Sequence, residues 1–199
     1  MRAAGAWGVL RTAALAVVVG ALGCSRAIAA DHSSSLGRIS PEHLVDQDGH
    51  AFGPAQLSGH VWITALMFSS CPMACPVVAQ RMAYLQTLLP AHAPSIRMLS
   101  VTLDPENDTP PTLAAFGARY HRDPQLWTLA TGTTQPVVDV VTAGYARTSP
   151  GGKSFDHGDT FTLIDGEGSV RGYYGKDDAD VARMLADADR IAGDRQATH

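Results

Sequence analysis

A telling stretch of this 199-residue chain is VWITALMFSSCPMACP, residues 61–76. Its first eight residues are apolar apart from one threonine, and a run of that length predicts a strand buried on both faces of a sheet. Pro76 suits the first turn of a helix, and apolar residues at helical spacing continue to residue 89. Cys71 and Cys75 therefore lie between the end of a buried strand and the beginning of a helix.

The sequence on either side of this stretch predicts a mixture of strands and helices. Upstream, Asp48-Gly49 between Val45 and Phe52 is typical of a β-hairpin turn. Downstream, the pattern predicts strands over 96–103 and 126–130, helices over 110–120, 134–145 and 177–191, and a hairpin of strands 160–165 and 169–174. This order predicts an α/β domain of thioredoxin-like arrangement, with an N-terminal β-hairpin and an inserted strand–helix.

The beginning of the chain has the pattern of an export signal. Two arginines are followed by about a dozen apolar or small residues, fewer than the ~20 that span a bilayer. Ala27-Ile28-Ala29 matches a signal-peptidase cleavage site, whereas the residues before Cys24 resemble a lipobox that would make Cys24 a lipidated first residue. A cleaved soluble form, an uncleaved membrane anchor and a lipoprotein all remain open. Each of them places the domain outside the cytoplasm, in a periplasm or its equivalent.

Composition fits a single globular domain behind that signal. Apolar residues make up 45% of the chain and charged residues 17%, a balance typical of a protein with a real core. We expect a signal or anchor over 1–30, a polar Ser-rich linker over 31–40, the folded domain over 41–193 and a tail over 194–199. The net charge is -4, and removal of a signal with three arginines and no acid leaves about -7. Such a domain is not expected to bind nucleic acid.

Cys71 and Cys75 have the spacing of a metal-binding or redox-active pair. Backbone N–H groups and the dipole at a helix start favour the thiolate, which is the form that both a nucleophile and a metal ligand need. The three-residue gap lets the two sulfurs converge on one ion, and equally lets them form a disulfide. A closed zinc site would need a fourth strong ligand, and the mature domain has no further cysteine.

His157 is the histidine best placed to complete a metal site. It lies in Phe155-Asp156-His157-Gly158, after a Gly-rich loop and directly before a predicted strand. In a thioredoxin-like fold that position lies opposite the cysteine turn. Two thiolates and one imidazole favour Cu(I), with Cu(II) as the other state such a set accepts. Asp156 either orients the ring from a second shell or is a solvated loop carboxylate.

Residues 104–110, DPENDTP, follow the end of another predicted strand. Asp108 and Thr109 lie directly before Pro110, which is the arrangement of a helix cap followed by a first-turn proline. We expect a capped turn from loop to helix here. A role in docking a partner or delivering a cation is the alternative.

These motifs together resemble the Sco (SenC) family of copper-insertion proteins. The resemblance covers about residues 44–191 and is carried by FSSCPMACP (68–76), SVTLDPENDTP (100–110), Asp156-His157 and TLIDGEG (162–168). Within that family the pattern departs at Met73, where many members have a carboxylate. It also departs at the N-terminus, where a full membrane anchor is common and the apolar stretch here is short.

The resemblance implies a thioredoxin-like domain exposed to the periplasm or intermembrane space, with copper held by Cys71, Cys75 and His157. It implies a copper enzyme as client, such as cytochrome c oxidase subunit II with its dinuclear copper site. Another periplasmic copper chaperone or a thiol reductase is the further partner it suggests.

Four functions compete for this site. A copper metallochaperone needs both cysteines and His157, whereas a thiol-disulfide oxidoreductase that keeps a client's copper-ligating cysteines reduced needs only the cysteines. A thiol peroxidase is disfavoured, because Thr64 and Phe68 occupy the positions where that chemistry wants proline and threonine or serine. A non-catalytic adaptor with a vestigial site is the fourth, and absence of both metal binding and redox activity would favour it.

Overall fold

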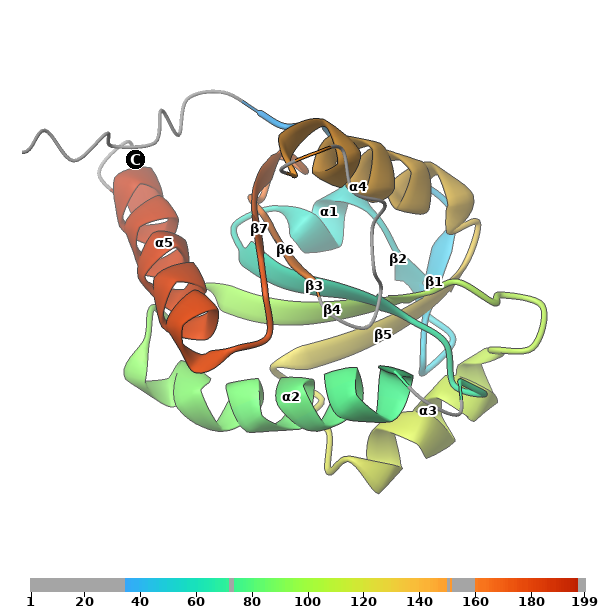
Figure 1. Ribbon diagram of the computed structural model, residues 1–199. Helices are drawn as coiled ribbons and strands as arrows, with labels where there is room; N and C mark the ends of the chain where they lie inside the picture. The colour runs from blue at the N-terminus through green and yellow to red at the C-terminus, as the bar shows by residue number, and fades with distance from the viewer. Residues whose placement is uncertain (1–34, 72–73, 150, 152–159, 197–199) are drawn as a thin grey trace, which may run out of the picture. The chain divides into compact units, whose positions relative to one another are not determined.

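The computed structural model describes residues 35–71, 74–149, 151 and 160–196. Its strands form one seven-stranded sheet in the order β2-β1-β5-β4-β3-β6-β7 (Figure 1). The strands are β1 (Leu44–Asp46), β2 (Ala51–Phe52), β3 (Val61–Met67), β4 (Ile96–Thr102), β5 (Trp127–Gly132), β6 (Phe161–Ile164) and β7 (Val170–Tyr174). The helices are α1 (Pro54–Leu57), α2 (Ala74–Leu88), the 3-10 turn η1 (Leu89–Ala91), α3 (Pro110–Arg119), α4 (Gln135–Thr148) and α5 (Asp178–Gln196).

The centre of the sheet is parallel and its outer pairs are antiparallel. Strand β4 pairs in parallel with β3 on one side and with β5 on the other. A parallel pair needs a crossover connection, which α2 supplies between β3 and β4 and α3 supplies between β4 and β5. All seven residues of β3 are buried, which confirms the prediction of a central strand covered on both faces.

Alternate residues of β3 face two separate cores. The odd-numbered residues of β3, from Val61 to Met67, pack in a core to which α2, α3 and α5 contribute. Trp62 and Leu66 point to the other face and pack with residues of α1 and α4. Figure 1 shows α2 and α3 on one side of the sheet and α1 and α4 on the other. Cys75 belongs to the first of these cores, so the helix that carries it is fixed by apolar packing.

The predicted elements are confirmed in kind and order. The N-terminal hairpin is β1–β2, the inserted strand–helix is β5–α4, and the last hairpin is β6–β7. The pattern did not predict α1 or η1, which are short and carry few periodic residues. It also ended α4 and α5 too early, because their last turns are too polar to show the apolar spacing.

The segment before β1 is packed against the domain. Leu36 N–H donates to the Val170 carbonyl at 2.9 Å, Val170 N–H donates to the Gly37 carbonyl at 2.8 Å, and Ile39 is buried. Residues 36–39 therefore cover the start of the edge strand β7, although the sequence had suggested a linker over 31–40. In the part of the chain that the structure describes, no helix is both long and apolar enough to cross a membrane.

Candidate metal centre

The two cysteines meet at a tight turn that follows β3. Cys71 N–H donates to the Phe68 carbonyl at 3.3 Å and closes this turn. Cys75, in the first turn of α2, donates its N–H to the Cys71 Sγ at 3.4 Å. The Phe68 N–H in turn donates to the Cys75 Sγ at 3.4 Å. The end of β3 and the start of α2 thus bring both sulfurs to one place, as the spacing predicted.

The two sulfurs differ in their access to solvent. Cys75 has no exposed surface and lies in the main core, whereas Cys71 is half-buried against the edge of that core. Both are free thiols in the structure, with no disulfide between them. Cys71 is therefore the sulfur that a partner can approach.

The pKa of the Cys75 thiol is raised to about 12, mainly by burial. The hydrogen bond from the Phe68 N–H lowers this pKa, and the neighbouring Cys71 and the charge of Asp108 raise it. The expectation that a helix start favours the thiolate is thus wrong for this cysteine. Its sulfur points into an apolar core, where desolvation of the charged form outweighs the helix dipole. A metal ion bound there must displace a proton from Cys75.

Asp108 connects the cysteine turn to the neighbouring strand. It has no exposed surface and accepts from Ser69 N–H at 3.0 Å. The hydroxyl groups of Ser69 and Thr102 also donate to its carboxylate. The turn into α3 was predicted, with Thr109 at the cap position and Pro110 at the helix start. The contact between Asp108 and Ser69 was not predicted, because no local sequence pattern indicates a hydrogen bond between residues 39 positions apart.

His157 and Asp156 lie outside the described residues, as do Cys24 and Met73. The structure does describe where the following strand begins. Strand β6 runs antiparallel to β3, with Thr162 opposite Thr64 and Ile164 opposite Trp62. The first residues of β6 therefore lie at the end of β3 from which the chain leaves for the cysteine turn.

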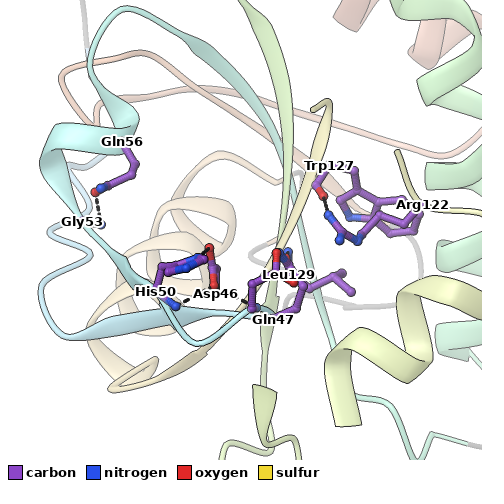
Figure 2. A network of polar contacts seen from close by, with 9 residues as sticks. Asp46, Gln47, His50, Gly53, Gln56, Arg122, Trp127 and Leu129 are labelled. Atoms are coloured by element: carbon purple, nitrogen blue, oxygen red, sulfur yellow. Dashed lines mark hydrogen bonds and ion pairs between the residues drawn. The ribbon is translucent and has the colours of Figure 1, made fainter. Parts of the chain in front are cut away.

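A second group of potential ligands lies on the β1–β2 hairpin (Figure 2). Ligand atoms of Asp46, Asp48 and His50 lie within 4.8 Å of one another. Asp46 Oδ1 accepts from the N–H groups of Asp48 and His50, both at 2.9 Å, and His50 is largely exposed. Gln47, between the two aspartates, accepts from Leu129 N–H and ties the hairpin to β5. These hydrogen bonds stabilise the hairpin turn, and this structural role explains why the three side chains lie together.

Three comparisons with known proteins all find proteins of the Sco type. The family model SCO1/SenC matches residues 36–193. The SCO1 protein homolog of Bacillus subtilis is 27% identical over 154 residues, which cover 75% of this chain and 80% of the relative.

Two solved structures are similar over most of their length. BsSco, a member of the Sco family of cytochrome c oxidase assembly proteins in which a disulfide switch was identified, has 26% identity and a TM-score of 0.64, over 80% of this chain and 96% of that one. Yeast Sco1 with copper bound has 26% identity and a TM-score of 0.58, over 77% of this chain and 92% of that one.

Proposed function

Because this chain belongs to the SCO1/SenC family, we propose that it is a copper metallochaperone that binds copper through Cys71, Cys75 and His157. The observation that carries the proposal is the pair of free thiols, one buried and one half-buried, held around a single turn. The likeness to yeast Sco1, whose structure contains copper, supports copper as the ion.

The two sulfurs offer copper one protected and one accessible ligand. Thiolates are soft donors that favour Cu(I), and an imidazole is a suitable third ligand for this ion. Cys75 gives up its proton as the ion binds, since burial keeps it a thiol in the metal-free chain. Transfer then proceeds by ligand exchange at Cys71: a client thiolate forms a bond to the ion as the Cys71 bond breaks, and no electron is transferred.

The register of β6 supports His157 as the third ligand. Thr160, just before β6, lies three residues after His157, so the chain between them spans at most about 10 Å. Because β6 begins beside the end of β3, this short span supports an imidazole ligand at the cysteine turn. Asp156 is the neighbouring carboxylate that would orient the ring.

The client in this proposal is a copper enzyme outside the cytoplasm, such as cytochrome c oxidase subunit II. BsSco, a member of a family of cytochrome c oxidase assembly proteins, supports this class of client. The export signal expected over residues 1–30 supports the compartment. A lipid on Cys24 or an uncleaved apolar stretch would hold the domain near a membrane-bound client.

A second candidate is a thiol-disulfide oxidoreductase that keeps the client's copper-ligating cysteines reduced. The hydrogen bond from the Cys75 backbone N–H to the Cys71 sulfur favours it, because it holds the two cysteines in one turn, where their thiols can form a disulfide. The disulfide switch in BsSco also supports it. This function needs both cysteines and is independent of His157.

Anaerobic titration with Cu(I) against a chromogenic chelator tests the first candidate. The sample is the reduced chain from Asp31 onward, which contains the compact unit of residues 32–199. We expect one tightly bound ion in the wild type, and much weaker binding in Cys71→Ala, Cys75→Ala and His157→Ala. His50→Ala is the matched control, since His50 is exposed on the distant hairpin. Binding well below one ion per chain, or binding unaffected by His157→Ala, would contradict the proposed ligand set.

A further inference from the structure

The buried carboxylate of Asp108 accepts several hydrogen bonds beside the cysteine turn. Its three donors come from two different parts of the chain: the N–H and hydroxyl of Ser69 after β3, and the hydroxyl of Thr102 at the end of β4. A buried carboxylate is costly to desolvate, and these hydrogen bonds offset that cost. Among the described residues no basic side chain forms an ion pair with it.

Helix capping does not explain this arrangement. The cap position of α3 is Thr109, and no side chain there bonds the free N–H groups of the first turn. Asp108 instead points across the sheet edge to Ser69, 39 residues earlier in the chain. The carboxylate of Asp108 therefore accepts its hydrogen bonds from the cysteine turn and from β4, and does not cap the helix that follows it.

Ser69 is the second residue of the turn that presents Cys71. The residue before it, Phe68, accepts from Cys71 N–H and donates to the Cys75 sulfur. A bond that fixes Ser69 therefore fixes the part of the backbone that sets the spacing of the two sulfurs. The negative charge of Asp108 also acts on Cys75, and a negative charge at this place favours a bound cation over an empty site.

We propose that Asp108 is a positioning residue of the copper site: by tying Ser69 to β4 it holds Cys71 and Cys75 at ligand spacing before the metal arrives. This inference rests on the proposed function, but it also concerns the dithiol itself. The hydrogen bonds of Asp108 go to Ser69 and Thr102, so it acts through the turn. Loss of the carboxylate removes the bonds that tie Ser69 to β4, so the two sulfurs spend less time in the geometry that both a metal ion and a disulfide need.

The test compares Asp108→Asn and Ser69→Ala with two control variants in the chain from Asp31 onward. Glu106→Gln removes the same charge from an exposed position of the same loop. Val141→Ala weakens the core on the other face of the sheet and controls for loss of stability. Circular dichroism and urea unfolding show first that each variant is folded.

The decisive measurement is the equilibrium with glutathione, which needs no copper. Glutathione disulfide oxidises the Cys71 and Cys75 thiols to their disulfide and leaves as two reduced glutathiones. We expect Asp108→Asn to lower this equilibrium constant about tenfold, as loss of a charged hydrogen bond predicts, and Ser69→Ala to lower it less, since the Ser69 N–H remains. An unchanged constant in Asp108→Asn, or an equal change in Val141→Ala, overturns the proposal.

Copper binding gives the second readout. Asp108→Asn should weaken Cu(I) binding about tenfold and alter the thiolate-to-metal absorption of the Cu(II) complex, while Glu106→Gln and Val141→Ala leave both unchanged. If the wild type binds no copper, the proposed function fails, and the glutathione equilibrium still decides the role of Asp108. A Cu(II) spectrum of wild-type shape and intensity in Asp108→Asn would contradict a positioning role.

Discussion

The backbone N–H of Cys75 donates to the Cys71 sulfur across 3.4 Å, yet the two thiols have different surroundings. Cys75 is wholly buried in the core beneath α2, and Cys71 is half-buried at its edge. In the proposed copper site, this asymmetry would give the pair a fixed inner ligand and an accessible outer one. Copper loading and release would then proceed through Cys71 while Cys75 keeps its place.

Removal of either cysteine should abolish tight copper binding but affect stability differently. We expect Cys71→Ala and Cys75→Ala each to weaken Cu(I) binding by more than about 100-fold. Cys71→Ala should change the free energy of unfolding by less than about 0.5 kcal/mol, and Cys75→Ala should lower it by about 1 kcal/mol because it opens a small cavity. Urea unfolding of the reduced, metal-free chains measures the difference. Equal losses of stability would contradict the unequal burial.

The reduced, metal-free domain should lose stability at alkaline pH. The Cys75 pKa rises from 9.0 to about 12 on folding, so its contribution is complete below pH 9 and is lost as pH rises towards 12. Burial raises the pKa of Tyr173 to about 12, and this tyrosine adds a loss of the same sign above pH 10. The decrease in the urea unfolding midpoint between about pH 8 and about pH 11 should therefore be larger in the wild type than in Cys75→Ala. An equal decrease of the midpoint in both proteins would show that Cys75 does not cause the alkaline loss of stability.

The buried indole of Trp127 should make Ser100 important for stability. Its Nε1–H donates to the Ser100 hydroxyl at 3.0 Å, and both residues are almost completely buried. Ser100→Ala leaves this donor unpaired, and we expect it to destabilise the domain by about 1–3 kcal/mol. Thr142→Ala is the control, because that hydroxyl bonds a carbonyl of its own helix, Val138, at a partly exposed site. Tryptophan fluorescence during urea unfolding measures both, and similar effects would rule out this explanation.

Two glycines with nearly the same positive φ should respond differently to alanine. Gly49 and Gly168 have φ values of +84° and +81°, which strain any residue with a Cβ. A Cβ at Gly168 would lie 2.6 Å from the Ile39 carbonyl oxygen, whereas nothing lies within 4 Å at Gly49. We expect Gly168→Ala to cost about 3 kcal/mol and Gly49→Ala about 1 kcal/mol. Thermal denaturation measures both, and a Gly49→Ala cost as large as that of Gly168→Ala would show that backbone strain alone decides.

The sequence predicted the elements of the fold well because their signals are local. The apolar run of β3, the Pro76 helix start and the turn at Asp48-Gly49 each depend on residues that are neighbours in the chain. Short elements such as α1 were missed, since four residues are too few to show a period. The pairing of Cys71 with Cys75 was predictable for the same reason, because a strand end and a helix start fix the geometry between them.

The amino-acid pattern by itself determined which segments form strands and helices, and that two thiols lie together at a strand-to-helix turn. Only the tertiary structure decided that Cys75 is buried deeply enough to remain a thiol, and that Asp108 bonds Ser69. The physical reason is that desolvation and side-chain hydrogen bonds depend on which distant segments the sheet brings together. Strand β4 lies beside β3 in the folded chain, and that neighbourhood is not encoded in any local stretch of sequence.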